Sequence, residues 1–254
     1  MKTFEHSLRV VRVSQQNENN NYVNGKMGFD YAINNKTNIG AVVSGFNNPD
    51  RTINTNISFL KNAISNVDSI VKSTNNMTDT WKNVSGNFYL QHKFDSLGKE
   101  MSIDIDASKF KSNGFSNLDN QMFNADNSFR SKNILIGKYP VEIQILSIKT
   151  DYSLPLKNKV KLELGTKSSY VETSNEANFY NQVNGVDFID YKKTNNFIYK
   201  ENINAGYINY SKEIKKWGFQ LGIRAENTNS TGHQKGNSQR ADSSFTRSYV
   251  NIFP

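Results

Sequence analysis

The chain has 254 residues, no cysteine and a formal net charge of +8, and these properties exclude several classes of protein. Without cysteine there is no disulfide framework, no thiol catalysis and no cysteine-ligated zinc. The mean hydropathy is −0.67, and no run approaches the roughly 18 to 20 apolar residues of a membrane helix, which excludes a helical membrane protein. Basic and acidic residues are interleaved without a basic block, so nucleic-acid binding is not indicated.

Strict alternation of apolar and polar residues recurs along the chain and predicts β-strands. In the clearest segment, 101–110, Ile103 and Ile105 share one face while Asp104 and Asp106 share the other. In chain order, the alternation predicts eight strands, at 22–33, 38–46, 86–94, 101–110, 142–154, 159–171, 198–211 and 217–229, and a ninth candidate at 8–13.

The eight strands are expected to pair as four hairpins with short polar turns. The connectors within the hairpins are 34–37, 95–100, 155–158 and 212–216. Between hairpins we expect long polar loops, at 47–84, 111–140 and 172–197. Short turns alternating with long loops are typical of outer-membrane barrels, whose turns are periplasmic and whose loops are extracellular, whereas a compact soluble domain seldom holds such loops. The pattern predicts an all-β, antiparallel transmembrane β-barrel.

Aromatic residues near the predicted strand ends are expected to form the two interfacial girdles of such a barrel. The residues concerned are Tyr22, Phe46, Phe88, Tyr89, Phe94, Phe110, Tyr152, Tyr170, Phe197, Tyr210 and Trp217.

Several stretches, taken in succession, resemble the outer-membrane β-barrel proteins of Bacteroidetes that belong with the TonB-dependent receptors. They are YVNGKMGFDY (22–31), INNKTNIG (33–40), SGFNNP (44–49), WKN (81–83), HKFDSLGKE (92–100), KTDYSLPLKNKVKLELGTKSSYV (149–171), FIYKENINAGYINYSKEIKKW (197–217), GIRAENTN (222–229) and SYVNIFP (248–254).

The resemblance implies a barrel of about 22 strands whose lumen holds a plug domain. Residues 1–254 would be an incomplete barrel segment in the outer membrane, without the signal peptide, the plug and the C-terminal strands. The implied function is binding and import of a bulky solute, with outer-membrane lipid, the plug and TonB as partners. The class of solute stays open: it could be a siderophore, a glycan, a peptide or another solute.

The candidate functional residues are polar side chains expected to face the lumen of the barrel. They are Asp104, Asp106, Lys161, Glu163, Arg224 and Glu226. Asp104 and Asp106 could form a carboxylate pair, although a wet lumen explains them more simply. Arg224 and Glu226 are expected to pair with each other or with a plug.

Catalytic, cofactor and metal sites are not predicted. The three histidines, His6, His92 and His233, are far apart in sequence, and none has a partner at a ligand spacing. No phosphate-binding glycine loop or nucleophile motif occurs. We therefore expect neither enzymatic activity nor a bound cofactor.

Two other hypotheses are weighed against the barrel. A secreted or surface-exposed all-β adhesion or glycan-binding protein would bury its apolar face between two sheets and dissolve without detergent. A soluble β-rich hydrolase would need an acid/base pair in a cleft, and the sequence shows none.

Overall fold

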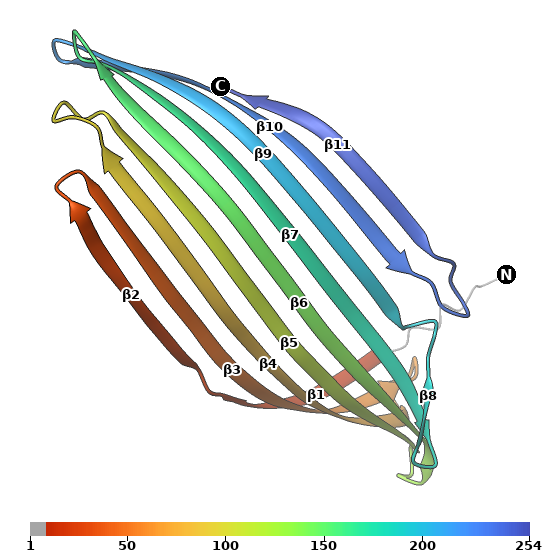
Figure 1. Cartoon of the computed structure of the whole chain (residues 1–254). Coiled ribbons are helices and arrows are strands. Elements are labelled where there is room, and N and C mark those ends of the chain that lie inside the picture. Colours follow the sequence, from red (N-terminus) through yellow and green to blue (C-terminus); the bar gives the residue numbers. More distant parts are fainter. Residues whose placement is uncertain (1–8) are drawn as a thin grey trace.

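The computed structural model describes residues 9–254, which form one antiparallel sheet of eleven strands (Figure 1). The strands are β1 (Arg9–Asn20), β2 (Val23–Asn34), β3 (Thr37–Lys61), β4 (Val67–Lys93), β5 (Glu100–Asn124), β6 (Phe129–Leu156), β7 (Val160–Val183), β8 (Val186–Ile189), β9 (Asn195–Ile214), β10 (Trp217–Lys235) and β11 (Ser243–Phe253). Their spatial order is β1-β3-β4-β5-β6-β7-β9-β10-β11, with β2 also beside β3 and β8 beside β7. The described residues include no helix long and apolar enough to cross a membrane.

At two places in the sheet, two strands pair with different halves of the same neighbouring strand. β1 pairs with the second half of β3, from Asp50 to Lys61, and β2 pairs with the first half, from Thr37 to Asn47. β8 and β9 share β7 in the same way. The sheet is therefore a meander of antiparallel strands in which each strand pairs only with strands close to it in the chain.

The four hairpins expected from the sequence are all confirmed, as β2–β3, β4–β5, β6–β7 and β9–β10. Polar side chains form the turns: the Asp95 carboxylate accepts hydrogen bonds from the Leu97 and Lys99 amides at 2.9 and 3.1 Å. Gly98 in that turn has φ of +95°, a conformation that glycine adopts without strain. The candidate strand at 8–13 is confirmed over its described part by β1, and residue 8 lies outside the described residues.

The prediction of long loops at 47–84, 111–140 and 172–197 was wrong. Most of these residues continue the strands, so that β4 has 27 residues and β6 has 28. Short connections at 62–66, 125–128 and 184–185 close the far ends. In these segments polar residues occupy both faces of the strand, so apolar and polar residues no longer alternate. The backbone hydrogen bonds between the strands continue all the same. Strand β11 also went unpredicted.

The two faces of the sheet differ sharply beside the short turns. Paired residues share a face, and Phe29, Ala41, Phe88, Ile105 and Ile148 follow one another across five strands. We call the region formed by these and the neighbouring apolar residues the apolar band. Its further members are Met27, Tyr31, Ile39, Val43, Val84, Leu90, Ile103, Ala107, Leu146, Leu164, Ile208, Leu221 and Ile223.

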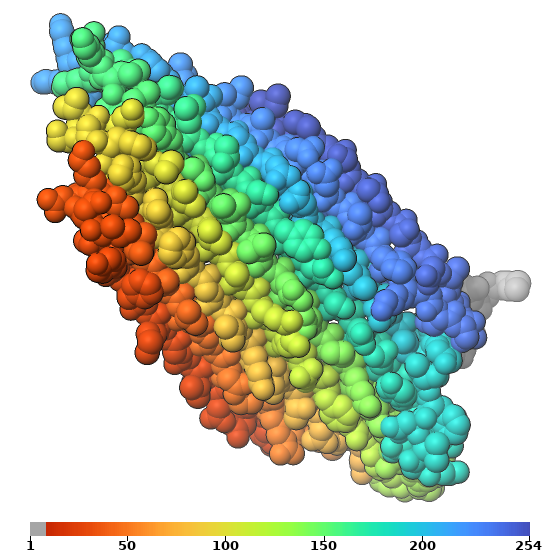
Figure 2. All heavy atoms as spheres, viewed as in Figure 1, coloured from red at the N-terminus to blue at the C-terminus, as the bar shows by residue number. Residues whose placement is uncertain are grey.

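No second layer covers the apolar band in the part of the chain described. Met27 is 81% exposed and Leu221 is 73% exposed, and the only buried apolar residues there are Ile70, Ile136 and Ala205. On the face that Figure 2 shows, successive strands form diagonal stripes in chain order, and no other segment lies across them. The two-sheet sandwich expected of a soluble adhesion protein is therefore not formed.

A line of interrupted pairing, which we call the seam, crosses the sheet beyond the apolar band. β4 and β5 are unpaired between 79–81 and 112–114, although the register is the same on both sides of the gap. β6 and β7 show a similar gap at 139–140 and 176–177, where Pro140 has no N–H to donate. Cross-strand partners put Pro49 beside Thr80 and Asn113 beside Pro140, so the two gaps lie at one level.

We expect backbone amides at 79–81 and 112–114 to exchange with deuterium about ten-fold faster than those at 84–90 and 103–107. The factor corresponds to roughly one lost hydrogen bond. Mass-spectrometric hydrogen exchange on the protein in lipid bilayers measures it. Equal protection along β4 and β5 would show that the seam is paired in solution.

Candidate functional site: the polar face of the sheet

The six residues predicted from the sequence lie on the face opposite the apolar band. Asp104 is in register with Lys149 of β6, and the same row continues through β7 and β9 to Glu226 of β10. One row nearer the short turns, Arg224 is in register with Tyr207. We call this side of the sheet the polar face.

The predicted pair of Arg224 with Glu226 forms directly, and Lys161 and Glu163 form a second pair that was not predicted. The Arg224 Nε atom lies 2.5 Å from Glu226 Oε1, and Lys161 Nζ lies 2.5 Å from Glu163 Oε1. Each pair joins residues two apart on one strand, where alternation puts both side chains on the same face. The polar face thus neutralises much of its own charge.

Asp106, one member of the carboxylate pair considered from the sequence, is hydrogen-bonded on both sides. The Asn87 amide donates to Asp106 at 2.8 Å, and the Ser147 hydroxyl donates to its other oxygen at 3.4 Å. Asp106 is thus held by neutral donors from the strands on both sides. This arrangement suits a structural carboxylate in a hydrated wall.

The sequence analysis missed a hydrogen-bonded arrangement that spans three strands, which we call a tyrosine bridge. The Tyr207 hydroxyl of β9 donates to Asp151 of β6, and its ring lies over Gly165 of the intervening strand β7. Lys149 Nζ lies 2.5 Å from the second oxygen of Asp151. A Cβ atom at position 165 would overlap the tyrosine ring, so only glycine leaves room for it.

A second tyrosine bridge has the same construction at the other side of the sheet. The Tyr89 hydroxyl donates to Asp30, and the ring lies over Gly40 of the intervening strand. In both bridges Asp, Gly and Tyr are direct cross-strand partners. A glycine within a strand could have indicated from the sequence that another group approaches the backbone closely. Which tyrosine and which aspartate meet there follows only from the register.

Beside the first bridge lies a hollow of about 230 Å³. Its lining comprises Gln91, Glu100, Ser102, Asp151, Tyr152, Ser153, Lys161, Glu163 and Tyr207. Ser153 is only 9% exposed, and its hydroxyl has no hydrogen-bond partner. With three carboxylates and one lysine in its lining, the hollow suits a ligand that carries hydrogen-bond donors. Among the described residues, no three acidic or histidine side chains are placed to hold a metal ion.

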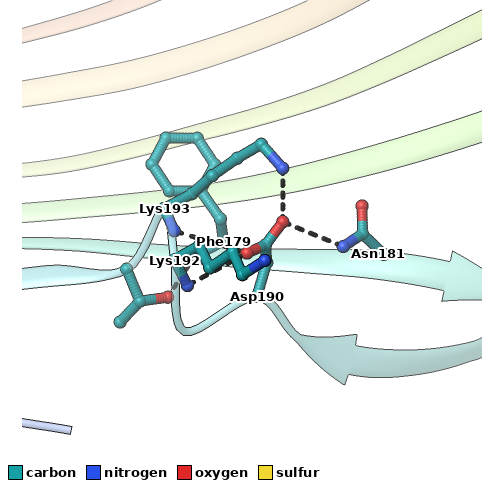
Figure 3. A network of polar contacts seen from close by, with 6 residues as sticks. Phe179, Asn181, Asp190, Lys192 and Lys193 are labelled. Atoms are coloured by element: carbon teal, nitrogen blue, oxygen red, sulfur yellow. Dashed lines mark hydrogen bonds and ion pairs between the residues drawn. The ribbon is translucent and has the colours of Figure 1, made fainter. Parts of the chain in front are cut away.

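A polar corner lies at the far end of the sheet, where the chain passes from β8 to β9 (Figure 3). Asp190 accepts hydrogen bonds from the Asn181 amide at 3.0 Å and from the Lys192 backbone at 3.1 Å, and it pairs with Lys193. The Thr194 hydroxyl accepts the Phe179 amide at 3.1 Å. These contacts fold residues 190–194 back onto β7.

The Lys193 ammonium and then the Asn181 amide lower the pKa of Asp190 to about 2, from an ordinary 3.8. Because this pKa is depressed, the corner is fully stabilised above about pH 4 and loses that stabilisation as the pH falls towards 2. We expect pepsin to cleave within 188–194 more readily at pH 2 than at pH 4. Asp190→Asn should be cleaved as readily at pH 4 as the parent is at pH 2; equal resistance would contradict the role of Asp190.

The girdle predicted from the aromatic residues forms only in part. Tyr22, Phe46 and Phe110 lie together, with ring centroids 5.7 and 6.4 Å apart, but the register puts Phe46 and Phe110 on the polar face. Phe94 and Tyr152 do contact each other beside the short turns, at 5.9 Å. Proximity to a strand end therefore did not determine which face an aromatic residue occupies.

Comparison with known proteins gives a family match and several similar folds. A model of the family described as outer membrane protein beta-barrel family matches residues 92–254. No curated protein matches the chain.

Among solved structures, the siderophore receptor PiuA of Acinetobacter baumannii is 10% identical, with a TM-score of 0.44, over 98% of this chain and 46% of that one. The ferric citrate transporter FecA is 12% identical, with a TM-score of 0.46, over 98% and 42%. The ferric-catecholate import receptor Fiu of E. coli K12 is 8% identical, with a TM-score of 0.45, over 98% and 47%. The chain spans less than half the length of each.

Proposed function

Because this chain belongs to the outer membrane protein beta-barrel family, we propose that it forms part of the wall of a large barrel that binds a bulky solute and imports it. Membership of this family places the protein in the outer membrane. The chemistry of its two faces supports a transport role rather than a catalytic one.

The observation that carries the proposal is the contrast between the apolar band and the polar face. Lipid acyl chains would cover the exposed side chains of the band, such as Met27 and Leu221. The six residues Asp104, Asp106, Lys161, Glu163, Arg224 and Glu226 would then face a hydrated lumen. Their ion pairs and hydrogen bonds lower the cost of placing charges at membrane depth.

The open sheet supports a barrel that is larger than the described strands. β2 and β11 each pair with one neighbour only among the described residues. Backbone groups that face lipid must be hydrogen-bonded, so we propose that further strands pair with both edges. Residues 1–254 would be the barrel segment of a longer receptor, whose wide lumen holds a plug and whose import is driven through TonB.

The length of the strands supports a solute site beyond the membrane. A crossing needs about 9 to 11 residues, whereas β6 has 28. At about 3.4 Å per residue β6 reaches roughly 95 Å, so more than half of it would project past the bilayer. We place solute contacts on the polar face of this projecting part. The class of solute stays open among a siderophore, a glycan, a peptide and other solutes.

Single cysteines test the assignment of the faces, because the natural chain has none. In the outer membrane of intact cells, Leu221→Cys should resist a water-soluble maleimide while Gln220→Cys on the neighbouring position reacts. A lipid-soluble maleimide should label Leu221→Cys and so show that the thiol is present. Rapid labelling of Leu221→Cys by the water-soluble reagent would refute the membrane-facing assignment.

Uptake itself is tested in cells that carry or lack TonB. Radiolabelled siderophores, oligosaccharides and peptides are supplied to a deletion strain and to the same strain with the gene restored. We expect one class to enter only when both the gene and TonB are present. Equal uptake in all strains for every class would exclude the import role while leaving the barrel fold untouched.

A further inference from the structure

Three lysines gather on the apolar-band side of the sheet, at the border between the band and the seam. On the apolar-band side of β4, Lys82 lies next to Val84 on the side of the seam, and on β5 Lys109 and Lys111 lie beyond Ala107 in the same direction. The band ends at these residues, because the apolar alternation of both strands stops there. We call Lys82, Lys109 and Lys111 the lysine patch.

The lysine patch has an excess of positive charge. Lys82 and Lys111 are direct cross-strand partners, and like charges in that position repel each other. Glu142 of β6 lies 2.6 Å from Lys109 and 2.9 Å from Lys111, so a single carboxylate is shared by two of the three lysines. Among the described residues Lys82 has no ion pair within 4 Å.

The backbone beside the patch is also open. The pair Lys82–Lys111 is the last one before the seam, and the three positions beyond it on β4 and β5 do not pair with each other, although they stay paired with β3 and β6. On the opposite face the Ser112 hydroxyl donates to Asp79 across the gap. On the face of the lysine patch, an anion between the two strands would relieve the repulsion among the cations. The structure thus combines a positive charge and a weak strand junction at one place.

We propose that the lysine patch binds the phosphate group of a lipid headgroup, in the leaflet that borders this edge of the apolar band. This inference rests on the proposed membrane location of the band. Lysine stems would lie along the acyl chains while the ammonium groups reach the headgroup level. The phosphate is placed between β4 and β5, because Glu142 and Glu176 line the hollow on the other side of Lys111.

The test uses the protein as purified from its native outer membrane in a mild detergent. The probes are bisphosphorylated lipid A, its dephosphorylated form and inorganic phosphate, and native mass spectrometry counts the bound molecules. Each lysine at an anionic surface contributes about five-fold in affinity. The triple variant Lys82→Gln, Lys109→Gln, Lys111→Gln should therefore bind phosphorylated lipid about 100-fold more weakly.

The matched control replaces Lys72 and Lys132, which lie on the same face of the sheet but further from the band. This double variant should keep the affinity of the parent. Lys82→Gln alone breaks no ion pair within the described residues and should lose about five-fold, so it serves if the triple variant fails to fold.

Each remaining result has a defined meaning. The proposal would be overturned if the parent and the triple variant bound phosphorylated lipid equally well. It would also be overturned if the parent bound the dephosphorylated lipid as tightly as the phosphorylated one. Binding of inorganic phosphate as tight as that of the lipid would assign the site to free phosphate instead. If the apolar band does not lie in the membrane, the water-soluble maleimide would label Leu221→Cys rapidly, and that result is independent of lipid binding.

Discussion

Replacing Gly165 with alanine is expected to destabilise the folded protein by about 1 to 3 kcal/mol, the usual cost of overpacking. The added Cβ would overlap the Tyr207 ring and displace the hydroxyl from Asp151. Loss of that hydrogen bond to a carboxylate adds to the steric cost. Urea unfolding in lipid bilayers, followed by tryptophan fluorescence, measures the change.

Gly86 is the matched control, since a Cβ there meets no atom within 4 Å. Gly86→Ala should change stability by less than about 0.5 kcal/mol. The Gly165 substitution should also cost less in a Tyr207→Ala background, because the ring it collides with is gone. Additive effects of these two substitutions would mean that the tyrosine bridge is not the source of the cost.

Leu221→Arg is expected to destabilise the protein by about 2 to 4 kcal/mol, the range for a basic residue at the lipid face near the bilayer midplane. Leu221 is 73% exposed in the middle of the band segment of β10. The cost arises because lipid cannot solvate the guanidinium. Unfolding in bilayers and the fraction of folded protein on unheated electrophoresis both report it.

The neighbouring substitution Gln220→Arg separates the two faces. Gln220 alternates with Leu221 and lies on the polar face, where water would solvate the new charge. We expect a change below about 1 kcal/mol, as for exposed surface positions. Equal losses at both positions would show that neither face meets lipid.

The sequence predicted the half of the sheet beside the short turns well, because a physical signal exists there. One face is apolar and the other polar, so residues such as Ile103 and Asp104 alternate strictly. The short turns carry their own signal, as in Asp95 and Gly98. Fold class, the four hairpins and the face of each candidate residue followed from these patterns.

The half of the sheet beyond the apolar band could not be predicted in this way. Beyond the band, polar residues occupy both faces, and segments such as 111–124 and 172–183 therefore look like loops although they are strands. Their regular structure depends on backbone pairing with neighbouring strands, which leaves no mark on residue type. Strand β11 was missed for a different reason: apolar residues lie on both of its faces, with Val250 and Ile252 on one and Tyr249 and Phe253 on the other, so strict alternation is lost.

The sequence by itself determined which side chains share a face, and hence the pairing of Arg224 with Glu226. Only the tertiary structure decided which rows of different strands meet. Register brings Tyr207 over Gly165 to Asp151, sets Lys82 opposite Lys111 and aligns the gaps of the seam. Alternation fixes a residue's face within one strand, but the relative shift between distant strands is set by turns and pairing along the whole sheet.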